Sequence, residues 1–166
     1  WNVVEIDAHD YDQIDKANAT INVTPYHVTY DVAAHTAAGT ATGIGGVALS
    51  GLDLSGTTHT NAGDYPSDPW TFTDVTGNYN NTSGKVDDNI KKADATVTVT
   101  GYTGVYDAAA HGATGTVVGV AGDLSAAGSS LNLGASFANV PGGTASWTFT
   151  GGTNYKDQNG TAAIII

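Results

Sequence analysis

The chain of 166 residues contains no cysteine, no methionine and no arginine. Without cysteine it can form neither a disulfide framework nor a thiolate zinc site. Strong helix formers such as leucine, glutamate and lysine are scarce, whereas threonine, asparagine and glycine, which favour strands and turns, are abundant. We therefore expect a protein built from strands, without long helices.

Positive charge is also scarce. Five lysines stand against 16 acidic residues, which gives a formal net charge of -11. This charge repels phosphate backbones and anionic lipid surfaces, so no nucleic-acid partner is expected. No segment approaches the roughly 20 apolar residues that a membrane helix needs, and no membrane insertion is expected.

The sequence begins at Trp1, and no basic segment followed by an apolar run opens it. Because the chain also lacks methionine, it has no ordinary translation start. We expect a processed mature product, for which removal of a signal peptide is the simplest route, or an excised fragment.

The motifs of common enzyme classes are missing as well. No serine lies in a G-x-S-x-G sequence, and there is neither an H-E-x-x-H motif nor a phosphate-binding loop. Glu5 is the only glutamate, so a glycosidase-like carboxylate pair would need aspartates. We expect a non-catalytic protein with no obligatory cofactor.

The second half of the sequence repeats the first. Four blocks recur in the same order at a nearly constant separation, and a one-residue insertion or deletion accounts for the drift. The matched blocks are 19–24 with 95–100, 30–35 with 106–111, 69–73 with 146–150, and 78–79 with 154–155. We expect one repeat over about residues 17–92 and another over 93–166, while residues 1–16 form an extension or a strand of a preceding or neighbouring domain.

Apolar and polar residues alternate within each repeat. Ile21 and Val23 alternate with threonine and asparagine, and Trp147 and Phe149 alternate with threonine. This period of two is typical of half-buried strands, and glycine-rich turns separate the runs. The pattern predicts an all-β protein with two tandem immunoglobulin-like repeats, each an antiparallel β-sandwich.

The motifs and their order resemble the immunoglobulin-like repeats called MBG or YDG domains. They are carried by Tyr106-Asp107 followed by His111, by Trp147-Thr148-Phe149-Thr150, by Asn154-Tyr155 and by the closing strand 161–166, with Tyr30-Asp31, His35 and Asn78-Tyr79 in the first repeat. These domains occur in tandem in large bacterial surface proteins. The resemblance implies an extracellular, cell-surface, adhesin-like segment without a catalytic site.

Four aromatic residues are predicted to anchor the core: Trp70, Phe72, Trp147 and Phe149. Their equivalent placement in alternating strands favours burial, since one aromatic side chain buries 150 to 250 Å². The alternative is a sugar-stacking platform.

Acidic residues near the N-terminus offer oxygen ligands for calcium. The candidates are Asp7, Asp10, Asp12 and Asp15. They lack the glycine and bidentate glutamate of an EF-hand, and an exposed charged linker is the alternative. Asp87-Asp88-Asn89 is a second candidate for calcium. His35 and His111 occupy equivalent positions, which favours a structural role in a turn or between sheets.

Three functions follow as hypotheses. The first is an extracellular stalk or spacer whose partners are neighbouring repeats. The second is a filament subunit that binds copies of itself by β-strand addition through Asn2, Val3, Val4, Glu5 and Ile6, or through the chain end at 164–166. The third is a module that binds a glycan or host surface, for which the sequence singles out no loop.

Overall fold

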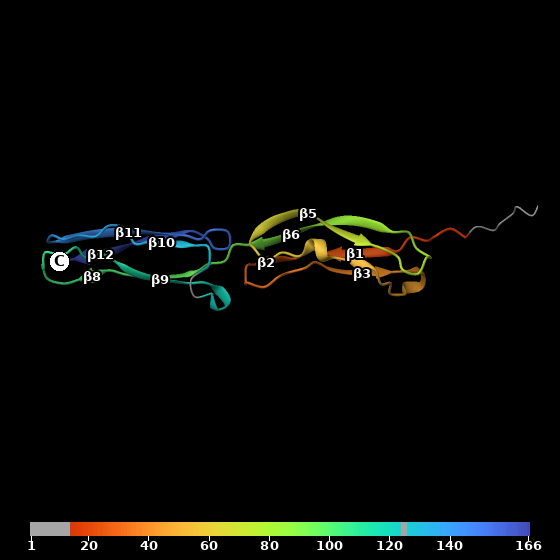
Figure 1. Ribbon diagram of the computed structural model, residues 1–166, viewed down its shortest axis with the longest axis horizontal. Coiled ribbons are helices and arrows are strands. Elements are labelled where there is room, and N and C mark those ends of the chain that lie inside the picture. Colours follow the sequence, from red (N-terminus) through yellow and green to blue (C-terminus); the bar gives the residue numbers. More distant parts are fainter. Residues whose placement is uncertain (1–13, 124–125) are drawn as a thin grey trace, which may run out of the picture.

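The computed structural model describes residues 14–123 and 126–166. All regular elements in these ranges are strands, apart from three short 3-10 turns (Figure 1). None of the described helices is long and apolar enough to cross a membrane. The all-β prediction is confirmed, and the molecule consists of two similar halves.

The first half contains a four-stranded sheet and a two-stranded sheet. The larger sheet has the order β2 (His27–Thr29), β6 (Thr82–Lys91), β5 (Gly63–Phe72), β4 (Leu52–Asp53). The smaller sheet pairs β1 (Thr20–Thr24) with β3 (Ala38–Thr42). Two 3-10 turns, η1 (Ile44–Gly46) and η2 (Ser55–Thr57), connect these strands.

The second half repeats this arrangement. Its larger sheet has the order β10 (Ser130–Asn132), β11 (Gly142–Thr150), β12 (Gln158–Ile165), β8 (Tyr102–Thr103). Its smaller sheet pairs β7 (Thr96–Thr100) with β9 (Thr114–Val118), and η3 (Val120–Gly122) follows β9. The internal sequence repeat is therefore also a structural repeat.

The larger sheets are mixed and not purely antiparallel as predicted, because β2 runs parallel to β6 and β8 parallel to β12. In each half one extended segment passes from the small sheet to the edge of the large sheet. This segment consists of β1 and β2 in the first half, and of β7 and β8 in the second half. Pro25 lies at the first crossing and has no N–H for a ladder. Gly101 lies at the second, where a Cβ would stand 2.0 Å from the Ala163 carbonyl oxygen.

The long hairpins β5–β6 and β11–β12 form the centre of each large sheet. Their registers agree except at a bulge in β5, where Pro66 and Ser67 lie between Tyr65 and Asp68, which pair with Asp88 and Val86. The β11–β12 ladder runs without a shift. The bulge therefore gives β5 one extra residue relative to β11.

Candidate functional site

The two halves lie end to end and meet at a short joint (Figure 1). Strand β6 ends at Lys91, and Ala93 already pairs with Tyr155 of the second half in a parallel bridge. Ala93 N–H donates to Asn154 O, and Lys156 N–H donates to Ala93 O, both at 2.9 Å. Only Lys92 lies between these contacts, so the linker leaves little freedom of movement.

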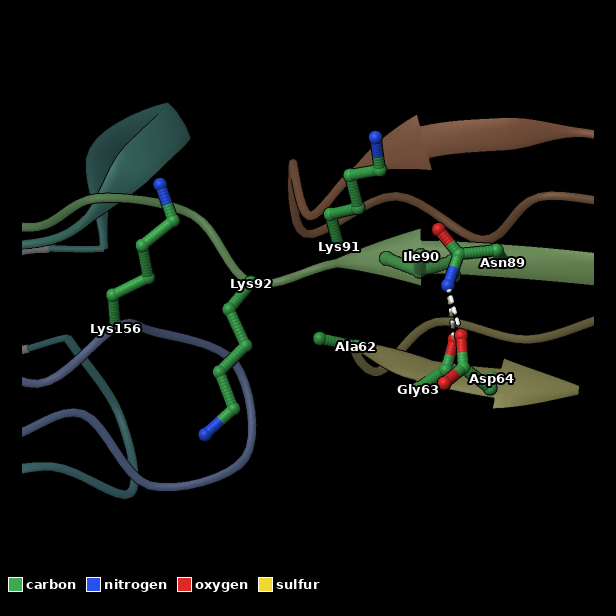
Figure 2. Close-up of a pocket in the computed structure, with 8 residues that line it drawn as sticks. All are labelled: Ala62, Gly63, Asp64, Asn89, Ile90, Lys91, Lys92 and Lys156. Carbon is green, nitrogen blue, oxygen red and sulfur yellow. Dashed lines mark hydrogen bonds between the residues drawn. The ribbon is translucent and has the colours of Figure 1, made fainter.

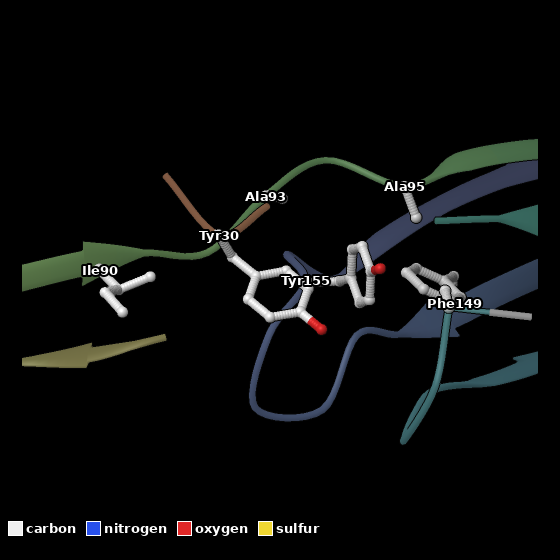
Figure 3. Packing of buried hydrophobic residues seen from close by; sticks show 7 residues of the cluster. Tyr30, Ile90, Ala93, Ala95, Phe149 and Tyr155 are labelled. Atoms are coloured by element: carbon white, nitrogen blue, oxygen red, sulfur yellow. The ribbon is translucent and has the colours of Figure 1, made fainter. Parts of the chain in front are cut away.

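A hydrophobic cluster spans this joint (Figure 3). Tyr30 and Ile90 come from the first half, and Ala93, Phe149 and Tyr155 come from the second. The rings of Tyr30 and Tyr155 meet edge to face, with centroids 5.5 Å apart and planes at 82°. Edge-to-face contact is a favourable geometry for aromatic rings, and the shared burial couples the two halves.

Asn154 binds the first half through both ends of its side-chain amide. Its Oδ1 accepts a hydrogen bond from Ala62 N–H at 2.9 Å, and its Nδ2 donates to Asn61 Oδ1 at 3.2 Å. Lys92 Nζ adds a hydrogen bond to Gly152 O at 2.7 Å. The two amide contacts fix the rotation of one half about the other, which the apolar cluster alone would leave less constrained.

Tyr155 is fully buried at the centre of the joint and is held by its hydroxyl group. The hydroxyl donates to Asp123 Oδ2 at 2.8 Å and accepts from Val120 N–H at 3.3 Å. Burial, followed by the hydrogen bond to Asp123, raises the pKa of Tyr155 to about 12. The phenol therefore stays neutral and keeps its donor role at any physiological pH.

A groove beside the joint is lined by Lys91, Lys92 and Lys156, three of the five lysines of the chain (Figure 2). Lys92 is bound to Gly152 O, and Lys156 forms an ion pair with Asp94 at 2.9 Å. On the opposite wall Asn89 donates to the Asp64 carboxylate. The polar groups of this groove are thus largely engaged with the protein itself.

A second unusual site lies inside the first repeat, where two aspartates face the core. Asp88 is 2% exposed, and its Oδ1 accepts Tyr26 N–H at 2.9 Å. Its Oδ2 has no hydrogen-bond partner among the residues described. Burial is the largest cause that raises the pKa of Asp88, and the neighbouring Asp68 adds to it, although the Tyr26 N–H acts in the opposite direction.

The groups around this pair are polar as well. Asp68 Oδ2 lies 2.8 Å from His59 Nε2, and the His59 ring stacks on Tyr65 with centroids 3.5 Å apart. The Tyr26 hydroxyl donates to Thr57 O at 3.1 Å. Burial, followed by the charges of Asp88 and Asp68, raises the pKa of Tyr26 to about 12.

The second repeat replaces this polar set with apolar residues. By strand register, Ile164 stands in place of Asp88 and Ala145 in place of Asp68, while Phe137 pairs with His111 as His59 pairs with His35. The same fold thus exists here with and without a buried carboxyl pair. Because the shared fold does not require it, the pair distinguishes the first repeat chemically from the second.

The aromatic residues predicted for the core point to the inner face of β5 and β11. Phe72 and Phe149 are buried, whereas Trp70 and Trp147 are only partly buried. Each indole lies over a glycine of the paired strand, Gly84 for Trp70 and Gly160 for Trp147. The indole rings therefore cover the adjoining strand and reach the edge of the core.

Among the residues that the structure describes, no predicted calcium ligands come together. Asp15 is exposed, while Asp7, Asp10 and Asp12 lie outside the described residues. Asp87 is exposed and binds Ser67 N–H, whereas Asp88 points into the core on the opposite face of β6. These neighbouring carboxylates cannot converge on one cation, and the described residues contain no group of three ligands suited to a metal.

The repeated histidines close equivalent turns. His35 Nε2 and His111 Nε2 each lie 2.9 Å from a carboxylate four residues earlier, Asp31 and Asp107. The imidazole hydrogen bond is the first cause that lowers the pKa of each aspartate, and a backbone N–H adds to it. This geometry assigns both histidines to the turn.

The segment predicted to exchange strands, Asn2, Val3, Val4, Glu5 and Ile6, lies outside the described residues. At the other end, Ile164 and Ile165 belong to β12, which is already paired with β11 on one side and β8 on the other. The closing strand therefore offers no free edge for strand addition at these residues.

Two features of these sites were not predicted from the sequence. Asp88 alternates with Val86 and Ile90, a period-two pattern that signals a shared inner face. The repeated Asn78-Tyr79 and Asn154-Tyr155 pairs indicated the internal repeat and the resemblance to MBG and YDG domains, but no contact between repeats. The contact of Asn154 with the first repeat has no local signal in the sequence, since Asn61 and Ala62 lie far from Asn154 along the chain.

The chain matches no protein-family model and no curated protein. The resemblance to MBG and YDG domains therefore stays a prediction.

Proposed function

We propose that this chain is a non-catalytic structural segment of a bacterial cell-surface protein, in which immunoglobulin-like repeats of the MBG or YDG type act as an extracellular stalk or spacer. The observation that carries the proposal is the joint. Two like repeats share one hydrophobic cluster, and Asn154 fixes their rotation with two hydrogen bonds. A joint of this kind holds the repeats in line, which is what a spacer requires.

The chemistry of the side chains supports the same function. The histidines described above are held in turns or stacked on tyrosines, and the joint lysines are largely engaged with the protein. Tyr65 and Tyr102, which a glycan platform would present to solvent, stack on His59 and His111. The acidic surface keeps such a rod soluble and disfavours association with anionic polymers.

Small-angle X-ray scattering of the full chain tests the proposal. We expect the wild-type curve to fit a single rigid rod. Asn154→Ala removes both amide contacts and should lower the mean radius of gyration, because the joint then bends. Asn159→Ala is the control, since Asn159 lies on the exposed face of β12.

Independent movement of the two repeats in the wild-type protein would argue against a spacer. Identical curves for wild type and both variants would show that the asparagine contacts do not set the alignment. Specific binding on a glycan array that depends on an exposed tyrosine would instead favour the binding-module alternative.

A further inference from the structure

The chain enters each repeat at an end with the same local geometry. In the second repeat this end packs against the first repeat at the joint. Ala17 pairs with Tyr79 as Ala93 pairs with Tyr155. Ala17 N–H donates to Asn78 O at 2.9 Å, and Ile44 N–H donates to Tyr79 OH at 3.1 Å. The corresponding bonds at the joint are 2.9 Å and 3.3 Å. We call the surface formed by Ala17, Ile44, Asn78 and Tyr79 the entry face.

Within the part of the chain that the structure describes, no repeat covers the entry face, whereas its counterpart at the joint is covered. Ile44 is 74% exposed, whereas its counterpart Val120 packs against the joint cluster. Tyr79 is partly exposed, whereas Tyr155 is fully buried. The side chains of the entry face, together with Ile14, line a groove. This end therefore presents a preformed apolar surface beside the Asn78 side-chain amide, which has no hydrogen-bond partner among the described residues.

The far end of the second repeat carries the complementary set. Tyr106 is 58% exposed, whereas its counterpart Tyr30 is buried in the joint. Val140 is the counterpart of Ala62, which binds Asn154 at the joint, and Val140 is also largely exposed. Ile166 takes the place of Ile90. We call the surface formed by Tyr106, Asn139, Val140 and Ile166 the exit face.

The segment that leads into the first repeat supports this correspondence. Ile14 precedes Ala17 by the same interval that separates Ile90 from Ala93. Ile14 is 94% exposed, whereas Ile90 is 1% exposed because it completes the end of the preceding sheet. The residues that lead into the first repeat thus have the same spacing as the residues that connect the two docked repeats at the joint.

We propose that the entry face binds the exit face of a second copy of this chain, head to tail, and reproduces the joint between the two repeats. In this contact Tyr106 packs against Tyr79, and Asn78 binds the Asn139-Val140 turn. The two faces differ from each other, so the contact does not close and extends into a linear array. The inference rests on the proposed spacer function and names its partner.

A fused tandem tests the contact with the linker length that the joint uses. Ile166 takes the position of Ile90, and Asp15 takes that of Lys91, so the full chain 1–166 is continued directly by residues 15–166 of a second copy. Hydroxyl-radical footprinting then compares Tyr79 and Tyr106 in the tandem and in the single chain. Tyr30 and Tyr155 serve as internal references, because the existing joint covers them in both proteins.

In the tandem each tyrosine of interest occurs once at an outer end and once at the new joint. We expect the average labelling of Tyr79 and of Tyr106 to fall to about half that of the single chain, because each repeat contacts only its neighbours. Equal labelling in the two proteins would overturn the proposal. The protein itself folds in either case, as the constant references report.

A variant in the second copy shows whether the asparagine acts as it does at the joint. Asn78→Ala in that copy should restore part of the labelling, whereas Asn159→Ala, on the exposed face of β12, should leave it unchanged. No difference between these variants would overturn the assigned role of Asn78. A flexible tandem whose single chains remain rigid rods would refute this inference and leave the spacer function standing, whereas glycan binding by a well-docked tandem would do the reverse.

Discussion

Asp88 shows how one residue can set the chemistry of a repeat without changing its fold. It lies on the inner face between Val86 and Ile90, where the second repeat has an isoleucine. A buried carboxylate whose second oxygen has no hydrogen-bond partner among the described residues is unfavourable when ionised, so burial favours the protonated form. The native state therefore binds a proton at Asp88 more tightly than the unfolded chain does.

This proton linkage predicts the effect of Asp88→Asn. Because the pKa of Asp88 is raised above its ordinary value of 3.8, its contribution to stability is present below that value and is lost as pH rises through the native pKa. Asn keeps the acceptor for Tyr26 N–H and cannot ionise. We expect the variant to be more stable than wild type near neutral pH, and this advantage to shrink as the pH falls toward the ordinary pKa of a carboxyl group.

Thermal unfolding across that pH range measures the difference. Asp87→Asn, on the exposed face of the same strand, is the matched control and should show no such trend. A wild-type protein that matches Asp88→Asn at every pH would show that Asp88 is not destabilised when charged.

Val32 illustrates strain at a single position. Its φ angle is 68°, a left-handed conformation that a β-branched residue rarely adopts, and Ala108 in the second repeat has φ 69°. The preceding aspartate binds Ala33 N–H and the His35 ring, and these contacts hold the turn in place. The shared conformation belongs to the turn and not to the valine.

Replacing Val32 by asparagine should therefore stabilise the first repeat. Asn tolerates the left-handed region, and the gain should be about 1 kcal/mol or somewhat less. Val47→Asn is the control, because Val47 is also exposed but has φ -67°. Chemical denaturation of both variants gives the comparison, and equal effects would mean that the turn carries no strain.

At the scale of elements, the sequence predicted the strands better than the sheets. The alternating patterns at 20–24, 96–100 and 146–150 correspond to β1, β7 and β11, because alternation directly encodes a two-faced strand. The parallel edges β2 and β8 are only two or three residues long and carry no pattern that reveals their direction. The bulge at Ser67 likewise depends on a register that only the paired strand defines.

The aromatic residues of β11 allow an element-scale prediction. Phe149 is almost fully buried, so Phe149→Ala should cost about 3 to 5 kcal/mol. Trp147 is only partly buried, and we expect Trp147→Ala to cost less, about 1 to 3 kcal/mol. Urea unfolding ranks the two variants. A larger cost for Trp147→Ala would place the indole, and not the phenyl ring, at the centre of this core.

At the scale of the whole molecule, the joint is what makes two repeats one rod. Its components were visible in the sequence only as repeated motifs, because nothing local links Asn154 to Asn61 and Ala62. Once the fold places them together, the amide contacts and the Tyr30–Tyr155 packing stabilise each repeat through the other. Neighbouring repeats coupled in this way unfold cooperatively when the interface energy exceeds their difference in stability.

This coupling predicts how the chain melts. The two repeats have different cores, since the first buries Asp68 and Asp88 where the second buries alanine and isoleucine. Separated from each other, they should therefore unfold at different temperatures.

We expect one calorimetric transition for the wild-type protein. We expect two transitions after insertion of two glycines between Lys91 and Lys92. This insertion displaces the Asn154 contacts and leaves the Ala93 bridge within the second repeat. The same insertion between Gly45 and Gly46, where a Cβ added at either glycine would meet no described atom within 4 Å, should leave a single transition. Two transitions in the wild-type protein would mean that the interface is weaker than the difference between the cores, and the rod would then depend on its short linker alone.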